Sequence, residues 1–145
     1  MLAAMFDDGT ITFAQKLSGR LTTIGPGLAD LELAADDPTP LGPAMQIGLQ
    51  LSFVTEHQFR ARGTVAVAGR DALAIATVDD GHLIETHDRG ARHGTAVLDA
   101  TGLGPLAGLH GRITSNFVVS GDGRVTDRQV LVLLRPQHHN QGGSP

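Results

Sequence analysis

The chain has 145 residues, which is the size of one domain and enough to bury a hydrophobic core without covalent cross-links. It contains no cysteine, which excludes disulfides and zinc–thiolate sites, and a formal net charge of −4 without any basic cluster argues against nucleic acid as a partner. Because no basic segment precedes the first apolar residues, and no apolar run approaches the ~20 residues that span a bilayer, we expect a cytoplasmic protein with neither a signal peptide nor a membrane segment.

The first third of the chain alternates apolar runs with turn signals, which predicts β-strands. Residues 10–23 form one long strand or a strand pair, with Gly19 at a bulge or bend. Residues 28–35 fit either a short helix or a strand, and the neighbouring strands favour the strand. The segment 36–43, with three prolines and a glycine, predicts a loop.

The longest extended segment is predicted over residues 45–62. From Leu51 onward its residues separate into two faces, and Phe53, His57 and Phe59 fall on the same one. An imidazole between aromatic side chains is a candidate acid or base, because histidine titrates near neutral pH. The alternative is a histidine whose hydrogen bonds are satisfied in the core or at a subunit interface.

Further strands are predicted over residues 64–88, with turns at 69–71 and 79–81. In the strand 82–88, Glu85 and His87 lie about 6.5–7 Å apart on one face. A carboxylate and an imidazole at this spacing can flank a substrate as acid and base. The alternative is a solvated strand face, since charged residues are mostly exposed. Gly90 and Gly94 then bracket a basic segment that we expect to be a loop.

The stretch 100–134 sets the fold. Glycines at positions 102, 104, 108 and 111 allow tight turns. Residues 112–119 have the period of a strand, the Gly-Asp-Gly sequence at 121–123 indicates a hairpin, and 125–134 returns antiparallel. With about eight strands spaced by roughly 8–12 residues, the sequence predicts one all-β domain over residues 1–135, a sandwich or a barrel. Residues 136–145 are predicted to be a disordered, flexible tail.

The glycine-rich stretch resembles that of the allene oxide cyclase and dirigent superfamily. The resemblance is carried by Gly102-Leu103-Gly104-Pro105-Leu106-Ala107-Gly108-Leu109-His110-Gly111, the Gly-Asp-Gly turn and the terminal Val-Leu-Val-Leu-Leu strand, with weaker matches at 36–43 and 80–94. It implies an eight-stranded antiparallel barrel, usually a homodimer or homotrimer, with a mostly apolar cavity. Relatives guide the cyclisation or coupling of reactive small molecules, and bacterial members include cyclases of polyketide pathways.

In such a barrel alternate residues of each strand face inward, so the candidate site is found from the strand faces. We assign acid–base roles to one set of residues and substrate contacts to a second. The catalytic set is Glu85, His87 and His57, and the substrate-binding set is Phe53, Phe59, Phe117, Asn116, Arg112 and His110. Asp127 and Gln129, on the face of Val125 and Leu131, could orient a carbonyl or an enolate, or be ordinary surface groups. Glu85, His87 and His57 are also the ligand types of a two-histidine, one-carboxylate iron site, but we expect no metal and no other cofactor.

These features lead to two functional hypotheses. The first is a small-molecule isomerase or cyclase that holds an apolar, reactive, polyketide- or lipid-like substrate in the barrel and adds acid–base assistance. The second is a non-catalytic carrier or sensor of a hydrophobic small molecule in the same cavity. A packed barrel whose polar groups face water or a partner subunit is the third possibility. We favour the enzyme, as a homodimer or homotrimer without nucleic-acid or membrane partners.

Overall fold

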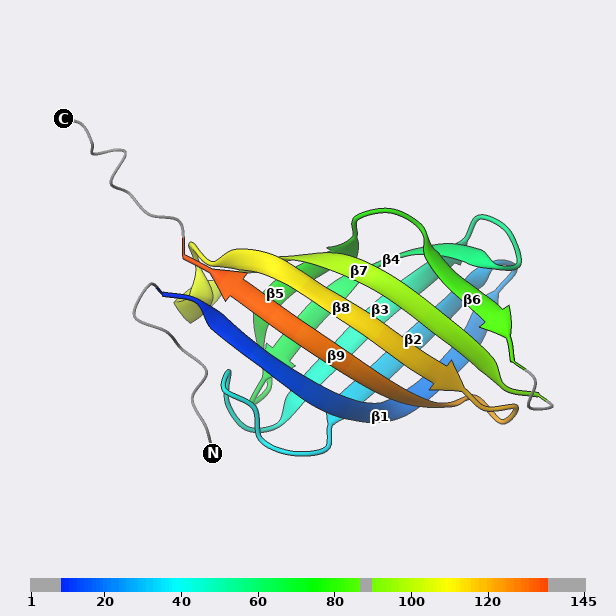
Figure 1. Ribbon diagram of the computed structural model, residues 1–145, viewed down its shortest axis with the longest axis horizontal. Helices are drawn as coiled ribbons and strands as arrows, with labels where there is room; N and C mark the ends of the chain where they lie inside the picture. Colours follow the sequence, from blue (N-terminus) through cyan, green and yellow to red (C-terminus); the bar gives the residue numbers. More distant parts are fainter. Residues whose placement is uncertain (1–8, 87–89, 136–145) are drawn as a thin grey trace.

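The computed structural model describes residues 9–86 and 90–135, which form nine β-strands and one short 3₁₀ turn (Figure 1). The strands are β1 (Ile11–Gly25), β2 (Leu28–Ala35), β3 (Met45–Phe53), β4 (Gln58–Val67), β5 (Arg70–Thr77), β6 (Gly81–Glu85), β7 (Arg92–Gly102), β8 (His110–Val119) and β9 (Arg124–Leu134). The 3₁₀ turn η1 (Gly104–Leu106) precedes β8. In the described part of the chain, no helix has the length and apolar character needed to cross a membrane.

The strands close into an antiparallel barrel. Hydrogen-bonded neighbours follow the order β3-β2-β1-β9-β8-β7-β5-β4, and β4 pairs back with β3. Closure pairs the long strands on both sides, so the barrel formed by residues 11–86 and 90–134 has no extended open edge. The predicted all-β, eight-stranded antiparallel barrel is therefore confirmed.

β5 and β6 together occupy one of the eight positions in the wall. β4 pairs with β6 at Gln58 and Phe59, and with β5 from Arg62 to Val67. β7 likewise pairs with β6 near its start and with β5 near its end. Because both are antiparallel to β4, β5 and β6 run in the same direction. They are two halves of one strand, interrupted at residues 78–80.

The connections gather at the two ends of the barrel (Figure 1). One end carries the start of β1, the end of β9, the β2–β3 and β4–β5 connections and η1. The opposite end carries the β1–β2, β3–β4 and β8–β9 connections, the end of β6 and the start of β7, and we call it the β8–β9 end. The candidate site described below lies at this second end.

Aromatic side chains fill the barrel beside β6. The Phe59 ring lies over Gly81 and the Phe117 ring over Gly94, so closely that a Cβ atom on either glycine would overlap the ring. The Phe53 and Phe59 ring centroids are 5.8 Å apart, and those of Phe59 and Phe117 are 6.2 Å apart. Both spacings suit tilted aromatic packing. Phe59 and Phe117 are each only 2% exposed, so they are core residues rather than the walls of an open cavity.

The prediction of one extended segment over residues 45–62 is wrong, because the chain turns back after Phe53. Phe53 and Phe59 are directly opposite each other in the β3–β4 pair. Their separation of six positions preserves the alternation of faces, so a period of two fits a hairpin as well as a single strand. No glycine or proline marks the turn, which is instead held by the Thr55 hydroxyl accepting from the backbone N–H groups of His57 and Gln58.

Other predictions for the first third of the chain are confirmed, except that of a bulge or bend at Gly19, which is wrong. Residues 28–35 form a strand, and β1 is one long strand rather than a pair. Its irregularity lies between Thr23 and Gly25, whereas Gly19 stays in register and allows close approach of β1 to the Glu32 carbonyl of β2. Residues 136–145, predicted to be a disordered tail, lie outside the described residues.

Candidate functional site: the open end of the barrel

Several side chains at the β8–β9 end point into the barrel but are not buried. In a sheet, directly opposed residues have side chains on the same face, so the partner of a buried inner residue is itself an inner residue. By this criterion the following residues are on the inner face while remaining half-buried or exposed: Leu21, Thr23, Phe53, Glu85 and Arg92. We call this set the barrel mouth. Its exposure shows that the barrel is open at this end.

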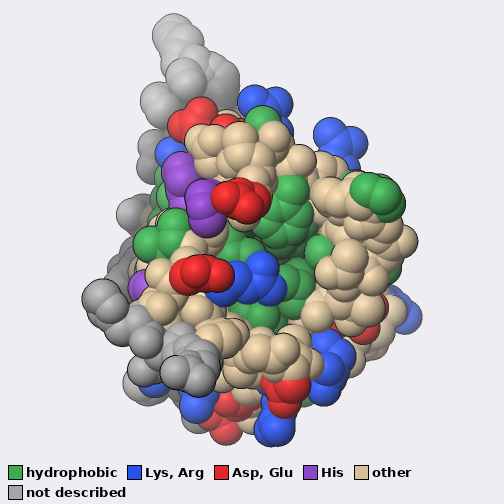
Figure 2. Space-filling model, turned by 90° about the vertical axis from the view of Figure 1, so that its right-hand side faces the viewer, with side chains coloured by type: hydrophobic (Ala, Val, Ile, Leu, Met, Phe, Trp, Pro, Cys, Tyr) green, Lys and Arg blue, Asp and Glu red, His purple; other side chains and the backbone are tan. Residues whose placement is uncertain are grey.

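Figure 2 looks directly at this end of the molecule and shows a hollow in it. The floor of the hollow is hydrophobic, the rim consists mostly of backbone and side chains that are neither hydrophobic nor charged, and a basic side chain lies in the opening next to an acidic one. Deeper in the barrel the packing is tight, with Leu17, Val65 and Ile113 each 0% exposed. The hollow is therefore a shallow cup rather than a channel through the barrel.

Arg92 and Glu85 are the charged members of the barrel mouth. Arg92 is opposite Val119, which is 0% exposed, and Glu85 is opposite Arg92 on the other side. Glu85 thus shares the inner face with buried Leu83, as predicted. Arg92 was missed, because the segment between Gly90 and Gly94 was expected to be a loop. Extending the alternation of Gly94, Ala96 and Leu98 backwards by two residues would have placed Arg92 on the inner face.

His57 lies on the rim of the same end, in the β3–β4 turn. Its Nδ1 atom is 3.3 Å from the Leu83 carbonyl oxygen, and its backbone carbonyl accepts a 2.9 Å bond from the Leu83 N–H. Nε2 is 3.5 Å from a Glu56 carboxylate oxygen, and the side chain is 56% exposed. Each ring nitrogen therefore faces a hydrogen-bond acceptor. His57 and Glu85 therefore lie at the same end of the barrel, while His87 lies outside the described residues.

A buried polar cluster crosses the inner wall formed by β8, β9 and β1. The Ser115 hydroxyl donates to Asp127, whose Oδ1 and Oδ2 are both 2.8 Å away. Gln129 Nε2 donates to Asp127 Oδ2 at 3.0 Å, and Gln15 Nε2 donates to Gln129 Oε1 at 3.1 Å. The Gln15 Oε1 atom is buried and accepts no hydrogen bond. Ser115, Asp127 and Gln129 are 4%, 1% and 3% exposed, so they are not surface groups.

Burial raises the pKa of Asp127 to about 6, against the lowering effect of hydrogen bonds from Ser115, Gln129 and the Asn116 backbone N–H. A carboxyl group in an apolar surrounding favours its neutral form, and the three donors compensate only in part. The sequence placed Asp127 and Gln129 on the correct face, with Val125 and Leu131. The sequence does not show, however, that the inner face of β9 is buried from Val125 to Leu133.

Three members of the predicted substrate-binding set lie outside the barrel. His110, Arg112 and Asn116 alternate with buried residues of β8 and point outward. Arg112 Nε pairs with Asp99 Oδ1 at 3.2 Å. Arg112 and Asn116 border a surface hollow of about 280 Å³ near the β5–β6 interruption. They cannot line the interior, because alternation gives the inner face to Ile113, Ser115 and Phe117.

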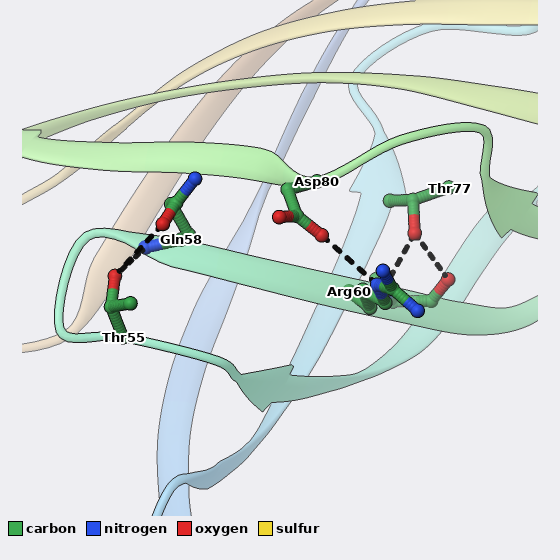
Figure 3. Close-up of polar contacts among 6 residues, drawn as sticks. Thr55, Gln58, Arg60, Thr77 and Asp80 are labelled. Carbon is green, nitrogen blue, oxygen red and sulfur yellow. Dashed lines mark hydrogen bonds and ion pairs between the residues drawn. The ribbon is translucent and has the colours of Figure 1, made fainter.

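The interruption between β5 and β6 is closed by side chains (Figure 3). The Thr77 hydroxyl accepts from the Ala61 N–H at 3.1 Å and donates to the Ala61 carbonyl at 3.4 Å, in place of a backbone ladder pair. Arg60 Nε pairs with Asp80 Oδ1 at 2.9 Å across the same gap. Figure 3 also shows the Thr55 and Gln58 side chains in contact at the β3–β4 turn. These contacts hold the wall together.

Among residues 9–86 and 90–135, no three histidine, aspartate or glutamate side chains are grouped so as to hold a metal ion.

Comparison of the chain with protein-family models, with curated proteins and with solved structures gives no match. Membership of the allene oxide cyclase and dirigent superfamily therefore stays a prediction from the residues that resemble it.

Proposed function

We propose that this protein is a binding protein for a small molecule whose apolar part occupies the barrel mouth. The observation that carries the proposal is the set of inner-face residues that remain accessible at the β8–β9 end, above a centre in which Leu17, Val65 and Ile113 are 0% exposed. A concave, mostly apolar site with a few polar groups is the usual form of a small-molecule site. A carrier or sensor needs no more than this.

The size of the ligand is limited by the packing beneath the mouth. Leu21 and Phe53 are half-buried and face inward, so an apolar group placed against them would remove their remaining surface from water. Such burial contributes roughly 25 cal/mol per Å². Below them, side chains such as Leu17 and Ile113 leave no accessible surface. The ligand therefore rests in the cup and does not thread through the barrel.

Binding is tested with Nile red, an uncharged dye that fluoresces in apolar surroundings. The chain has no tryptophan and no tyrosine, so intrinsic fluorescence contributes little background. Leu21→Glu puts a charge on the inner face of the mouth, and Thr22→Glu puts the same charge on the adjacent outer position. We expect Leu21→Glu to abolish dye binding and Thr22→Glu to preserve it, with circular dichroism confirming that both fold. Equal binding by both variants would refute a site in the mouth.

The second candidate is the isomerase or cyclase, favoured by the placement of His57 and Glu85 at the same end. The His57 ring is held between the Leu83 carbonyl and the Glu56 carboxylate, and histidine is the side chain most often used in general acid–base catalysis. The test recovers the small molecule that co-purifies with the protein, by native mass spectrometry, and incubates it again with fresh protein. Conversion that falls about 100-fold in His57→Gln or Glu85→Gln would support catalysis. An unchanged molecule supports the carrier.

A further inference from the structure

We infer that the ligand of the barrel mouth carries an anionic group, a carboxylate or a group of similar charge, which Arg92 binds. The inference rests on the proposed function and names the class of ligand: an amphiphile with one negatively charged end and one apolar end. It is carried by the position of Arg92, by its burial compared with the other arginines and by its lack of a partner.

The position of Arg92 is fixed by its neighbours in the sheet. It is opposite Val119 of β8, which is 0% exposed, and two residues before the buried Gly94. Both relations place its side chain on the inner face. The guanidinium group thus originates from the barrel wall at the mouth, above the Phe117 ring that covers Gly94.

Arg92 differs from the other described arginines in burial. It is half-buried, whereas the following arginines are all exposed: Arg20, Arg60, Arg62, Arg70, Arg112, Arg124, Arg128 and Arg135. Exposed guanidinium groups are satisfied by water. One that is drawn into an apolar cup loses part of its hydration and gains most from a charged acceptor.

No such acceptor contacts the Arg92 side chain in the described part of the chain. Arg60, Arg112 and Arg124, on the outer surface, each pair with an aspartate at 2.9, 3.2 and 3.1 Å. The Arg92 side chain makes no hydrogen bond or ion pair within residues 9–86 and 90–135, although Glu85 is opposite it in the β6–β7 pair. Five N–H donors in a planar fork, carried by an inner-face residue of the mouth, therefore lack a partner among the described residues, and their geometry matches the two oxygens of a carboxylate.

Glu85 limits the charge of the ligand. A carboxylate at the same rim repels a second negative charge, while a single anionic group can bind Arg92 on the side away from Glu85. The expected ligand is therefore a monoanion attached to an apolar body, and a polyanion is excluded. Removing the Glu85 charge should strengthen anion binding, whereas a purely catalytic role for Glu85 would leave binding unchanged.

The experiment measures displacement of Nile red by three probes with the same chain length: decanoate, decanol and decyltrimethylammonium. Arg92→Met removes the charge and keeps much of the apolar stem, and Arg92→Lys keeps the charge. Arg128→Met, on the exposed outer face of β9, is the matched control. We expect wild-type protein to bind decanoate best and Arg92→Met to lose at least tenfold in decanoate affinity. In Arg92→Met, the affinity for decanol should change less than threefold. Arg92→Lys should recover part of the lost decanoate affinity, and Glu85→Gln should bind decanoate a few fold more tightly than wild type. Arg128→Met should bind both probes like wild type.

The outcomes separate the two proposals. If decanol and decanoate bind wild type equally and Arg92→Met affects neither, the anionic ligand is refuted and apolar binding stands. If neither probe nor Nile red binds wild type, the proposed function itself fails. Should Arg92→Met not fold, the wild-type protein decides the question, because raising the salt concentration must weaken decanoate and not decanol. Equal salt dependence of the two probes would overturn the role of Arg92.

Discussion

The Ser115 hydroxyl lies 2.8 Å from both carboxylate oxygens of Asp127, inside the sealed wall of the barrel. Hydrogen bonds from Ser115, Gln129 and the Asn116 N–H all favour the ionised carboxylate, yet burial outweighs them and raises the pKa of Asp127 to about 6. The native barrel therefore binds a proton at this group more tightly than the unfolded chain does.

The first prediction concerns stability and pH. Because the pKa of Asp127 is raised from 3.8 to about 6, its contribution is fully present below pH 3.8 and is lost as the pH rises through 6. The free energy of unfolding should fall by up to about 3 kcal/mol across this window, at 1.36 kcal/mol for each pKa unit. Urea unfolding of wild type and Asp127→Asn between pH 4 and pH 8 isolates the effect. If the free energy of unfolding changed with pH in the same way in both proteins, Asp127 would not be the source of the pH dependence.

The second prediction concerns the β4–β5 turn. Ala68 has a φ of 52°, in the left-handed region, and is followed by Gly69 at 81°. A residue with a Cβ atom is strained there by about 1–2 kcal/mol, and glycine relieves this at some entropic cost. Ala68→Gly should raise the free energy of unfolding by about 0.5–1 kcal/mol. Ala66→Gly, two residues earlier in β4, is the control and should lower it by about the same amount.

The third prediction concerns the aromatic packing beside β6. A Cβ atom at Gly94 would overlap the Phe117 ring, whereas one at Gly48 of β3 would meet no atom within 4 Å. Overpacking of this kind costs about 1–3 kcal/mol. We expect Gly94→Ala to lower the melting temperature clearly and Gly48→Ala to leave it unchanged or slightly higher. Similar melting temperatures for both variants would mean that the Phe117 ring moves aside freely.

The fourth prediction concerns the closure of the strand interruption. Thr77→Val keeps the shape of the side chain but leaves the Ala61 N–H and carbonyl without their partner. The loss should be about 1–3 kcal/mol, the cost of an unsatisfied buried polar group. Thr77→Ser retains the hydroxyl and should recover most of it. Chemical denaturation of the three proteins measures the difference, and equal losses for valine and serine would point to packing instead.

The fold was largely predictable because it depends on a local pattern repeated many times. Alternation in β8 and β9, with Gly-Asp-Gly between them, predicts a hairpin whatever the rest of the chain does. The β3–β4 turn was not predictable in the same way. Phe53 and Phe59 lie on the same face of the sheet whether the chain continues straight or reverses between them. The turn itself is closed by Thr55, without glycine or proline.

The site was less predictable because exposure at an inner position depends on distant strands. Glu85 was placed on the correct face, but nothing in its own strand reveals that Phe53 and Leu21 come to the same opening. Arg92 was not predicted as a site residue because the glycines at positions 90 and 94 indicated a loop rather than a strand. The burial of Asp127 could not be predicted, because carboxylates are mostly exposed and only closure of the barrel buries this one.

The division of one strand into β5 and β6 also affects how the barrel opens. β6 is held by four residue pairs with β7 and two with β4, whereas β8 and β9 share ten. Segments with few cooperative hydrogen bonds exchange their amide protons through local opening rather than global unfolding. We expect the amides of β6 to exchange faster than those of any other strand in residues 11–134. Since Glu85 ends β6, one side of the mouth can then yield to an entering molecule while the remaining wall stays folded.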